Sequence, residues 1–332
     1  MKILITGGAG FIGSAFIRRI LETTDYKILN IDNLSYAGNL NNIPNSDSPN
    51  YEFSRLDISN FTDIQAAVTD FKPTRIVNFA AESHVDRSIK DSIAFVNTNI
   101  LGTYNLLEIA RENKNLLDAD FIFHHISTDE VYGDIGLNDF PPSESSPYNP
   151  SSPYSASKAS SDMLVKAWNR TYKIPTIISN CTNNYGPYQY PEKLIPVIIL
   201  NALHKKKIPI YGDGKQIRDW IYVEDHVDGL ISLIYKGEAN NSYNFGGNNQ
   251  IQNIDVAKKI CQILNKNKPS DSFDYESLIE YVSDRPGHDI RYALDITKSK
   301  NTLNWKPSTN FDIGLQKTVE WYLNNPTWWK KE

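Results

Sequence analysis

A glycine-rich segment near the start of the chain constrains its fold more than any other feature. Residues 2–6 (KILIT) form a short apolar run typical of a buried strand, and residues 14–21 have the spacing of a helix. Between them Gly7, Gly10 and Gly13 follow a Gly-x-x-Gly-x-x-Gly pattern. Such glycines let backbone N–H groups approach a pyrophosphate and let the helix pack closely on the strand. The segment therefore predicts the first unit of a dinucleotide-binding sheet.

The acidic residue after the next strand indicates which dinucleotide binds. Residues 26–31 have the pattern of a second strand, and Asp32 follows it directly. A carboxylate at this point could bind both hydroxyls of a ribose and would repel a 2′-phosphate. We therefore predict NAD rather than NADP as the cofactor. The alternative is a purely structural turn in which Asp32 only caps a loop.

Strand-like runs alternate with helical patterns through the first half of the chain, which predicts an α/β fold with a doubly wound parallel sheet. Further strands are expected at 51–56, 75–79, 121–127 and 176–180, and helices at 61–71, 93–113 and 155–172. Asp32, Asp57, residues 80–83 and residues 128–130 fall at or just after strand ends. In such sheets ligands bind at the carboxyl ends of the strands. We therefore expect these residues to meet at one edge of the sheet.

Composition excludes several other classes of protein. A net charge of −5 without a basic tract argues against nucleic-acid binding. Cys181 and Cys261 are far apart, which predicts no disulfide framework and fits a reducing cytoplasm. We expect no membrane span, because no apolar run is long enough, and no signal peptide, because the first residues already read as a strand. No cluster of His, Cys and Asp has metal-ligand spacing, so we predict no metal.

Tyr154 and Lys158 form the first of two acid–base systems. They are four residues apart and so share one face of the expected helix. A nearby ammonium favours the phenolate, so we expect Lys158 to lower the pKa of Tyr154. Tyr154 could then take a proton from a substrate hydroxyl while a hydride leaves the same carbon for a nicotinamide.

Asp129 and Glu130 form the second system. They follow the expected strand 121–127, and at a strand end that turns into a loop both carboxylates can face a substrate. Paired carboxylates in different environments can hold different protonation states, as acid and base roles require. A solvated acidic turn is the alternative.

These residues belong to a set of motifs that resembles the extended short-chain dehydrogenase/reductase superfamily and, within it, the dTDP-glucose 4,6-dehydratases. The motifs are TGGAGFIGS, AAESHVDRS, HHISTDEVYGD, SPYSASKASSD, NCTNNYGPY, PEKLIP, PIYGDG, QIRDWIYVEDH and DRPGHD. The resemblance implies a Rossmann-type sheet and a cycle of oxidation at carbon 4, loss of water across carbons 5 and 6, and hydride return. It implies that Thr128 binds the carbon 4 hydroxyl, Glu130 removes the carbon 5 proton and Asp129 protonates the departing hydroxyl.

The resemblance also implies the residues of both binding sites. The cofactor residues would be Gly7, Gly10, Phe11, Ile12, Gly13, Asp32, Asn33, Leu34, Ser35, Asp57, Ile58, Ala80, Ala81, Ser83, Thr98, Tyr154, Lys158 and Asn184. The substrate residues would be Ser83, Thr128, Asn183, Lys193, Leu194, Pro209, Tyr211, Arg218, Asn253, Arg285 and His288. Arg218, Arg285 and Lys193 are candidates for the substrate's pyrophosphate, since arginine matches phosphate geometry. Surface charge, loop hydrogen bonding or packing is the alternative for these positions.

By the same resemblance the chain would have two lobes and form a homodimer. The cofactor domain would span residues 1–184 plus about 222–250, with a helix at 223–235 and a strand at 242–245. The nucleotide-sugar domain, a smaller C-terminal substrate-binding lobe, would span 185–221 plus about 251–332. Helices 93–113 and 155–172 would form the dimer interface, although their apolar positions could equally be core.

Two other functions remain open at this point. The chain could be a 4,6-dehydratase or an epimerase for another nucleotide sugar such as UDP-glucose, because uracil and thymine differ by one methyl group. It could also be a catalytically silent NAD-binding regulatory protein.

Overall fold

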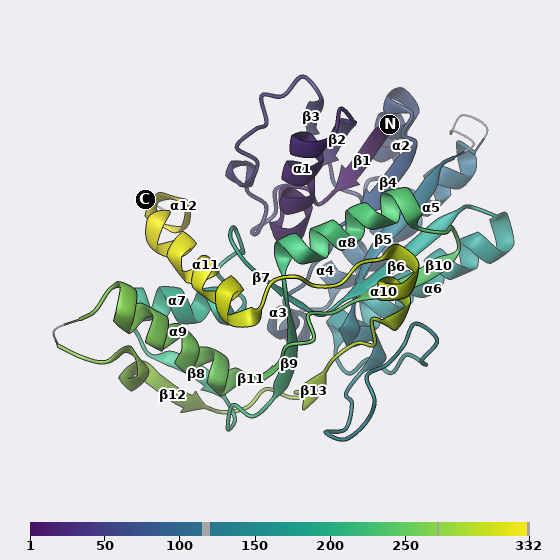
Figure 1. Ribbon diagram of the computed structural model, residues 1–332. Coiled ribbons are helices and arrows are strands. Elements are labelled where there is room, and N and C mark those ends of the chain that lie inside the picture. Colours follow the sequence, from purple (N-terminus) through teal and green to yellow (C-terminus); the bar gives the residue numbers. More distant parts are fainter. Residues whose placement is uncertain (115–119, 271, 331–332) are drawn as a thin grey trace.

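A parallel sheet forms the centre of the larger lobe. The computed structural model describes residues 1–114, 120–270 and 272–330. Within these ranges seven strands lie in the order β10-β6-β5-β4-β1-β2-β3, all parallel (Figure 1). Their bounds are β1 (Lys2–Thr6), β2 (Lys27–Ile31), β3 (Tyr51–Ser54), β4 (Arg75–Asn78), β5 (Ile122–Thr128), β6 (Thr176–Cys181) and β10 (Asn241–Phe245).

Helices cover both faces of this sheet. On one face α1 (Phe11–Thr23) packs beside α8 (Val223–Lys236), and α2 (Phe61–Phe71), α5 (Thr103–Glu112) and α6 (Pro153–Tyr172) cover the other. Short helical segments complete this lobe: η1 (Leu40–Asn42), α3 (Val85–Lys90), α4 (Ile93–Phe95), η2 (Val96–Gly102), η3 (Asp129–Tyr132) and α10 (Thr297–Leu303). The predicted doubly wound α/β fold is confirmed.

A second core lies beside the sheet, at the lower left of Figure 1. Its strands are β7 (Asn183–Tyr185), β8 (Ile208–Tyr211), β9 (Ile217–Tyr222), β11 (Gln250–Gln252), β12 (Ile279–Val282) and β13 (Arg291–Tyr292). Strand β9 pairs with β7, β11 and β13, and β8 pairs with β12. Its helical segments are α7 (Leu194–Leu203), α9 (Asn253–Asn267), η4 (Tyr275–Leu278), α11 (Phe311–Asn324) and α12 (Pro326–Trp329). No helix in the described ranges is both long and apolar enough to cross a membrane.

Helix α6, which carries Tyr154 and Lys158, has strong local start and stop signals. Ser152 and Ser155 form a reciprocal capping box, and Pro153 occupies the first helical position. At the other end Lys173 adopts a left-handed conformation, with φ of 59°, and closes the helix. The sequence therefore fixes the position of this helix along the chain.

The continuous helix expected at 93–113 is wrong. The chain forms α4, then a π-helical stretch, η2, and then α5. Within η2 the buried Asn99 bonds both backbone groups of Glu82 and the Ser157 hydroxyl. A Cβ on Gly102 would lie 2.4 Å from the Ile58 side chain. These tertiary contacts override the regular helical repeat, and π-turns of this kind are frequent at functional sites.

Candidate active site

A cavity of about 570 Å³ opens at the carboxyl ends of the sheet strands and reaches into the second core. Residues from both sides line it, including β1–α1, the loop after β4, η3, α6 and α7. Every predicted catalytic, cofactor and substrate residue lies on its wall except Leu34. The structure thus brings these distant segments together at one site.

The β1–α1 turn has the geometry of a pyrophosphate cradle. Gly7 has φ of +70°, and a Cβ there would lie 2.5 Å from the Ala80 nitrogen; a Cβ on Gly13 would lie 2.5 Å from the Gly7 carbonyl oxygen. Helix α1 begins at Phe11 rather than at the predicted Ser14, with no capping side chain and no acidic residue in its first turn. Its N-terminal N–H groups and the positive end of the helix dipole suit a bound phosphate.

Asp32 is held in place by the backbone around it. Its Oδ2 accepts from the Ala9 nitrogen (3.0 Å) and its Oδ1 from the Leu34 nitrogen (2.8 Å). Leu34, which has φ of 53°, thereby orients the carboxylate instead of lining the cavity. Burial raises the pKa of Asp32, and these two hydrogen bonds lower it. Each oxygen keeps a further lone pair for a ribose diol.

The other predicted cofactor residues continue the wall on either side of this turn. Asn33 donates to Asp57 Oδ2 (3.0 Å), which links the loops after β2 and β3. The remaining wall residues of this set are Ile12, Ser35, Ile58, Ala80, Ala81, Ser83, Thr98 and Asn184. Together with the turn and Asp32, they form a site that fits a dinucleotide.

Tyr154 and Lys158 lie on one face of α6 and both line the cavity, as expected from their spacing. The expected lowering of the pKa of Tyr154 is wrong for the protein alone. Burial raises the pKa of this phenol well above its usual value, and the charge of Glu130 raises it further. The Lys158 ammonium is directed instead to the Ile126 carbonyl (2.8 Å) and lies 3.2 Å from His125 Nε2.

Asp129 and Glu130 occupy the first turn of η3, directly after β5. The Thr128 hydroxyl accepts from the Glu130 nitrogen (3.3 Å) and donates to Asp129 Oδ1 (3.2 Å), so it joins the two residues. Asp129 is 3% exposed, and within the described residues its Oδ2 has no hydrogen-bond partner. Burial raises the pKa of Asp129 well above its ordinary value, and Glu130 adds to the shift.

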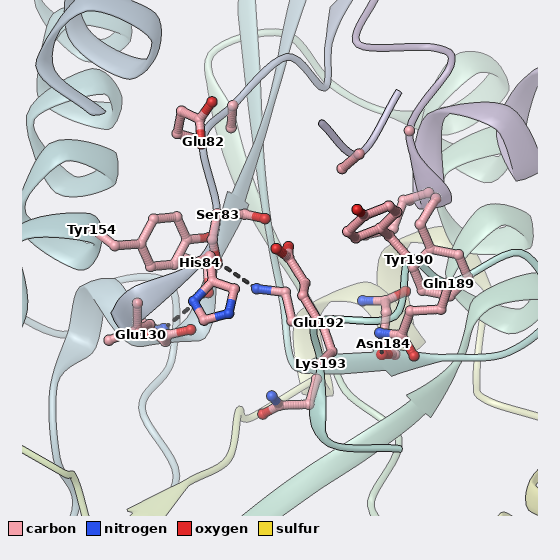
Figure 2. Close-up of a pocket in the computed structure, with 18 of the residues that line it drawn as sticks. Glu82, Ser83, His84, Glu130, Tyr154, Asn184, Gln189, Tyr190, Glu192 and Lys193 are labelled. Atoms are coloured by element: carbon pink, nitrogen blue, oxygen red, sulfur yellow. Dashed lines mark hydrogen bonds between the residues drawn. The ribbon is translucent and has the colours of Figure 1, made fainter. Parts of the chain in front are cut away.

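The electrostatic surroundings of Glu130 differ from those of Asp129, because several cationic side chains face Glu130. Burial raises the pKa of Glu130, but Lys193, Arg285 and Arg218 lower it. Figure 2 shows Glu130 and Tyr154 reaching toward Glu192 and Lys193 across the cavity. The two adjacent carboxyls therefore have different proton affinities, with the greater elevation at Asp129.

The predicted substrate residues form the far wall of the cavity. Lys193 donates to the Ser83 carbonyl, and α7 begins at Leu194 with its positive end at the cavity. Arg218 is buried and donates to the carbonyls of Ile217 (2.8 Å) and Asp289 (2.9 Å). The remaining members of the set on this wall are Asn183, Pro209, Tyr211, Asn253, Arg285 and His288.

The sequence prediction missed contacts that tie the two walls together. Tyr36 donates from its hydroxyl to Glu192 Oε1 (3.2 Å). Asp86 accepts from the Tyr211 hydroxyl at Oδ2 (3.1 Å) and pairs with Arg285 through Oδ1 (3.5 Å). Asp86 lies within the quoted motif AAESHVDRS and Glu192 within PEKLIP, so their membership of these motifs was the available signal.

Comparisons with known proteins identify the family. The model of the GDP-mannose 4,6 dehydratase family matches residues 4–318. The dTDP-glucose 4,6-dehydratase of Neisseria meningitidis serogroup B is 52% identical over 99% of this chain and 95% of its own length.

Solved structures give the same result. The dTDP-glucose 4,6-dehydratase of Bacillus anthracis in complex with NAD has a TM-score of 0.87 and 45% identity, covering 99% of this chain and 98% of its own. The enzyme of Streptomyces venezuelae with NAD and TYD bound has a TM-score of 0.91 and 40% identity, covering 99% of both chains. With this agreement over nearly its whole length, the chain belongs to the family of dTDP-glucose 4,6-dehydratases.

Proposed function

We propose that this protein is an NAD-dependent hydro-lyase that converts dTDP-glucose to dTDP-4-dehydro-6-deoxy-glucose. The observation that carries the proposal is the pairing of Asp129 and Glu130, which have different proton affinities, beside Tyr154 in a cavity that fits a dinucleotide. An oxidoreductase needs only Tyr154 and a hydride acceptor. The two carboxyls add the acid and the base that removal of water requires.

Oxidation is the first stage. Thr128 binds the hydroxyl at carbon 4 of the sugar, and Tyr154 accepts the proton of that hydroxyl. A bound nicotinamide would supply the hydride acceptor in its oxidised form and the hydride donor in its reduced form, so carbon 4 could be oxidised and carbon 6 reduced without a second reagent. Lys158 supplies a cation one turn along α6 from the phenol, whose ionisation burial and Glu130 oppose.

Elimination is the second stage. The new carbonyl at carbon 4 acidifies carbon 5, and Glu130, whose pKa the facing cations lower against the effect of burial, takes the carbon 5 proton. Asp129, whose pKa is raised furthest by burial, gives its proton to the hydroxyl that leaves carbon 6. The carbon 6 hydroxyl and the proton from Asp129 therefore leave together as water. At this point Glu130 has gained one proton and Asp129 has lost one.

Substrate binding would use the far wall of the cavity. We assign the diphosphate to Arg285, Lys193 and the N-terminus of α7, which together supply charge and backbone donors. The buried Oδ1 atoms of Asn183 and Asn253 have no partner within the described residues and are available to ligand donors.

A panel of nucleotide sugars tests this proposal. The purified protein is incubated with dTDP-glucose, UDP-glucose and GDP-mannose, and loss of water is followed by mass spectrometry. We expect dTDP-glucose to turn over best, although a single methyl group is worth only about 1–3 kcal/mol of discrimination. Faster dehydration of UDP-glucose, epimerisation without loss of water, or cofactor binding without any turnover would each overturn the assignment.

We also propose that the protein is a homodimer. Apolar side chains are exposed along α4, η2, α5 and α6, including Ile93 (58%), Leu101 (42%) and Met163 (47%). Clustered apolar exposure of this kind is typical of interaction surfaces. Light scattering should give twice the chain mass, and Ile93→Glu with Met163→Glu should give the monomer mass.

Two further assignments remain proposals. We place the cofactor domain at 1–184 plus about 222–250 and the nucleotide-sugar domain at 185–221 plus about 251–332, whose last two residues lie outside the described ranges. The pairing of β10 with β6 supports this division, whereas Ile296, Leu303 and Trp305 pack into the first core. We propose a cytoplasmic location, which the two free thiols at Cys181 and Cys261 support.

A further inference from the structure

Lys158 sits on a buried polar cluster that the reaction described above does not use. Lys158 is 3% exposed, and its ammonium donates to the Ile126 carbonyl (2.8 Å) and lies 3.2 Å from His125 Nε2. Asp162, one turn further along α6, is fully buried and has Oδ1 3.5 Å from the same imidazole nitrogen. Three ionisable groups therefore meet behind the active-site face of α6.

Asp162 is fixed by donors from two sides. Its Oδ2 accepts from the Ser127 hydroxyl (2.8 Å) and from the Tyr148 hydroxyl (2.9 Å). Its Oδ1 has no hydrogen bond within the described residues and faces His125. An anchored carboxylate with one enclosed, unused oxygen costs free energy unless a cation compensates it.

The tautomer of His125 determines which hydrogen-bond donors face Asp162 Oδ1. Asn78 donates through Nδ2 to His125 Nδ1 (3.2 Å), while Asn78 Oδ1 accepts from the Thr6 hydroxyl (2.6 Å). Burial lowers the pKa of His125 well below its usual value, and Lys158 lowers it further. The imidazole is therefore neutral and carries its proton on Nε2, which cannot accept from Lys158. The Asp162 carboxylate therefore faces the imidazole N–H at 3.5 Å and acts on the ammonium through its charge, which raises the pKa of Lys158.

The pKa shifts of Lys158 and Asp162 indicate that each group stabilises the charged form of the other. Burial lowers the pKa of Lys158 to about 8, and Asp162 raises it. Burial raises the pKa of Asp162, and Lys158 lowers it. Several other titratable groups lie near the cluster: His124 from β5, Cys181 from β6, Asp129, Glu130 and Tyr132 from η3, Tyr148 from the loop before α6, and Tyr154 and Lys166 from α6 itself. Within the cluster, Asp162 is the carboxylate positioned to keep the lysine charged.

We propose that Asp162 and His125 are positioning residues that hold Lys158 as an ammonium, one turn along α6 from Tyr154, for the oxidation step. The catalytic part of this inference rests on the proposed function, whereas the charge of Lys158 does not. Asp162 supplies the countercharge, and the His125 imidazole places Nε2 3.5 Å from the carboxylate and 3.2 Å from the ammonium. A cluster that only supported the packing of α6 would leave the pH dependence of cofactor reduction unchanged when the charge of Asp162 is removed.

Nitrogen-15 NMR of the lysine side chains tests the charge directly in the full-length protein. The Lys158 signal is identified by its loss in Lys158→Met and is titrated in wild type, Asp162→Asn and the control Asp225→Asn. Asp225 is a buried carboxylate that accepts from Ser308 and Thr309, remote from α6. We expect at least a tenfold fall in the proton affinity of Lys158 in Asp162→Asn and none in Asp225→Asn. An unchanged titration midpoint in Asp162→Asn overturns the proposal.

The pH dependence of the hydride step tests the catalytic consequence. Lys158 is charged below its pKa, so a lower pKa moves the alkaline decline of cofactor reduction to lower pH. Asp162→Asn should show this shift, Asp162→Glu should largely reverse it, and an identical profile in wild type and Asp162→Asn contradicts the role in oxidation.

If dTDP-glucose is not the substrate, the NMR titration still determines whether Asp162 keeps Lys158 charged. If Asp162→Asn does not fold, the Asp162 carboxyl of the wild-type protein is followed by carbon-13 NMR instead. The proposal requires this carboxyl to be ionised where Lys158 is charged, so a protonated Asp162 at pH 7 overturns it.

Discussion

The two acid–base systems share one cavity but are built from different parts of the molecule. The contacts of Lys158 and of its neighbour Asp162 come from β5, α6 and the loop before α6. The cations that lower the pKa of Glu130, by contrast, are Lys193, Arg285 and Arg218, which belong to the region of the second core. The oxidising pair is therefore complete within the larger lobe, while the eliminating pair acquires its charges from across the cavity.

This difference has a mechanistic consequence. A change within α6 or β5 should slow oxidation. The later stages then slow as well, because they need the sugar that has been oxidised at carbon 4. A change among the facing cations should leave oxidation in place and alter the proton affinity of Glu130. The contrast between the lobes can therefore be tested stage by stage.

The largest effect is expected from removing the phenol in the larger lobe. Tyr154→Phe keeps the ring but deletes the proton acceptor, so reduction of bound NAD⁺ in a single turnover should slow by roughly 10²–10⁴-fold. Tyr281→Phe, an exposed tyrosine on β12, is the matched control and should react at the wild-type rate. A wild-type rate of NAD⁺ reduction in Tyr154→Phe would remove Tyr154 from the role of base.

A smaller effect is expected at the cofactor end of the same lobe. Asp32→Ala deletes an acceptor for two ribose hydroxyls, and hydrogen bonds to a charged group are worth about 1.5–3 kcal/mol. NAD affinity should fall roughly tenfold or more and the preference over NADP should narrow, measured by calorimetric titration of both cofactors. Asp47→Ala, an exposed acid, should change neither. Equal affinity of the unmodified protein for NADP would contradict the role given to Asp32.

The smallest effect is expected from the facing cations. Lys193→Met removes a charge that lowers the pKa of Glu130, so that pKa rises and the acid decline of elimination moves to higher pH. Elimination should therefore be several-fold slower on the acid side at saturating substrate, with NAD⁺ reduction unchanged. Lys215→Met, on an exposed turn, serves as the control. Equal slowing of both stages would show that the division between the lobes is wrong.

The parts of the fold that the sequence predicts are those with local signals. The strand KILIT, the glycine turn and the bounded helix α6 each carry their own start or stop residues, so the sheet and the placement of Tyr154 follow from short segments. Adjacency alone places Asp129 and Glu130 together. The predicted gathering of polar residues at strand ends is likewise a consequence of parallel pairing.

The remaining features depend on partners far away in the chain. The π-turn at 96–102 exists because Asn99 and Gly102 meet Glu82, Ser157 and Ile58, which no helical repeat reveals. The direction of the Lys158 ammonium depends on β5, not on its spacing from Tyr154. Local periodicity therefore predicts the helices and strands, while hydrogen bonds between buried polar groups determine the orientation of side chains such as Lys158.

The most direct test of the account separates the two systems in one measurement. Glu130→Gln and Asp129→Asn are nearly isosteric and change only the proton inventory of the eliminating pair. Each variant is mixed with dTDP-glucose while the absorbance of reduced nicotinamide and the yield of 6-deoxy product are followed together. We predict that NADH forms and persists while product formation stalls, and that Glu130→Gln suppresses exchange of solvent deuterium into carbon 5. Formation of 6-deoxy product at wild-type rates by both variants would contradict the account.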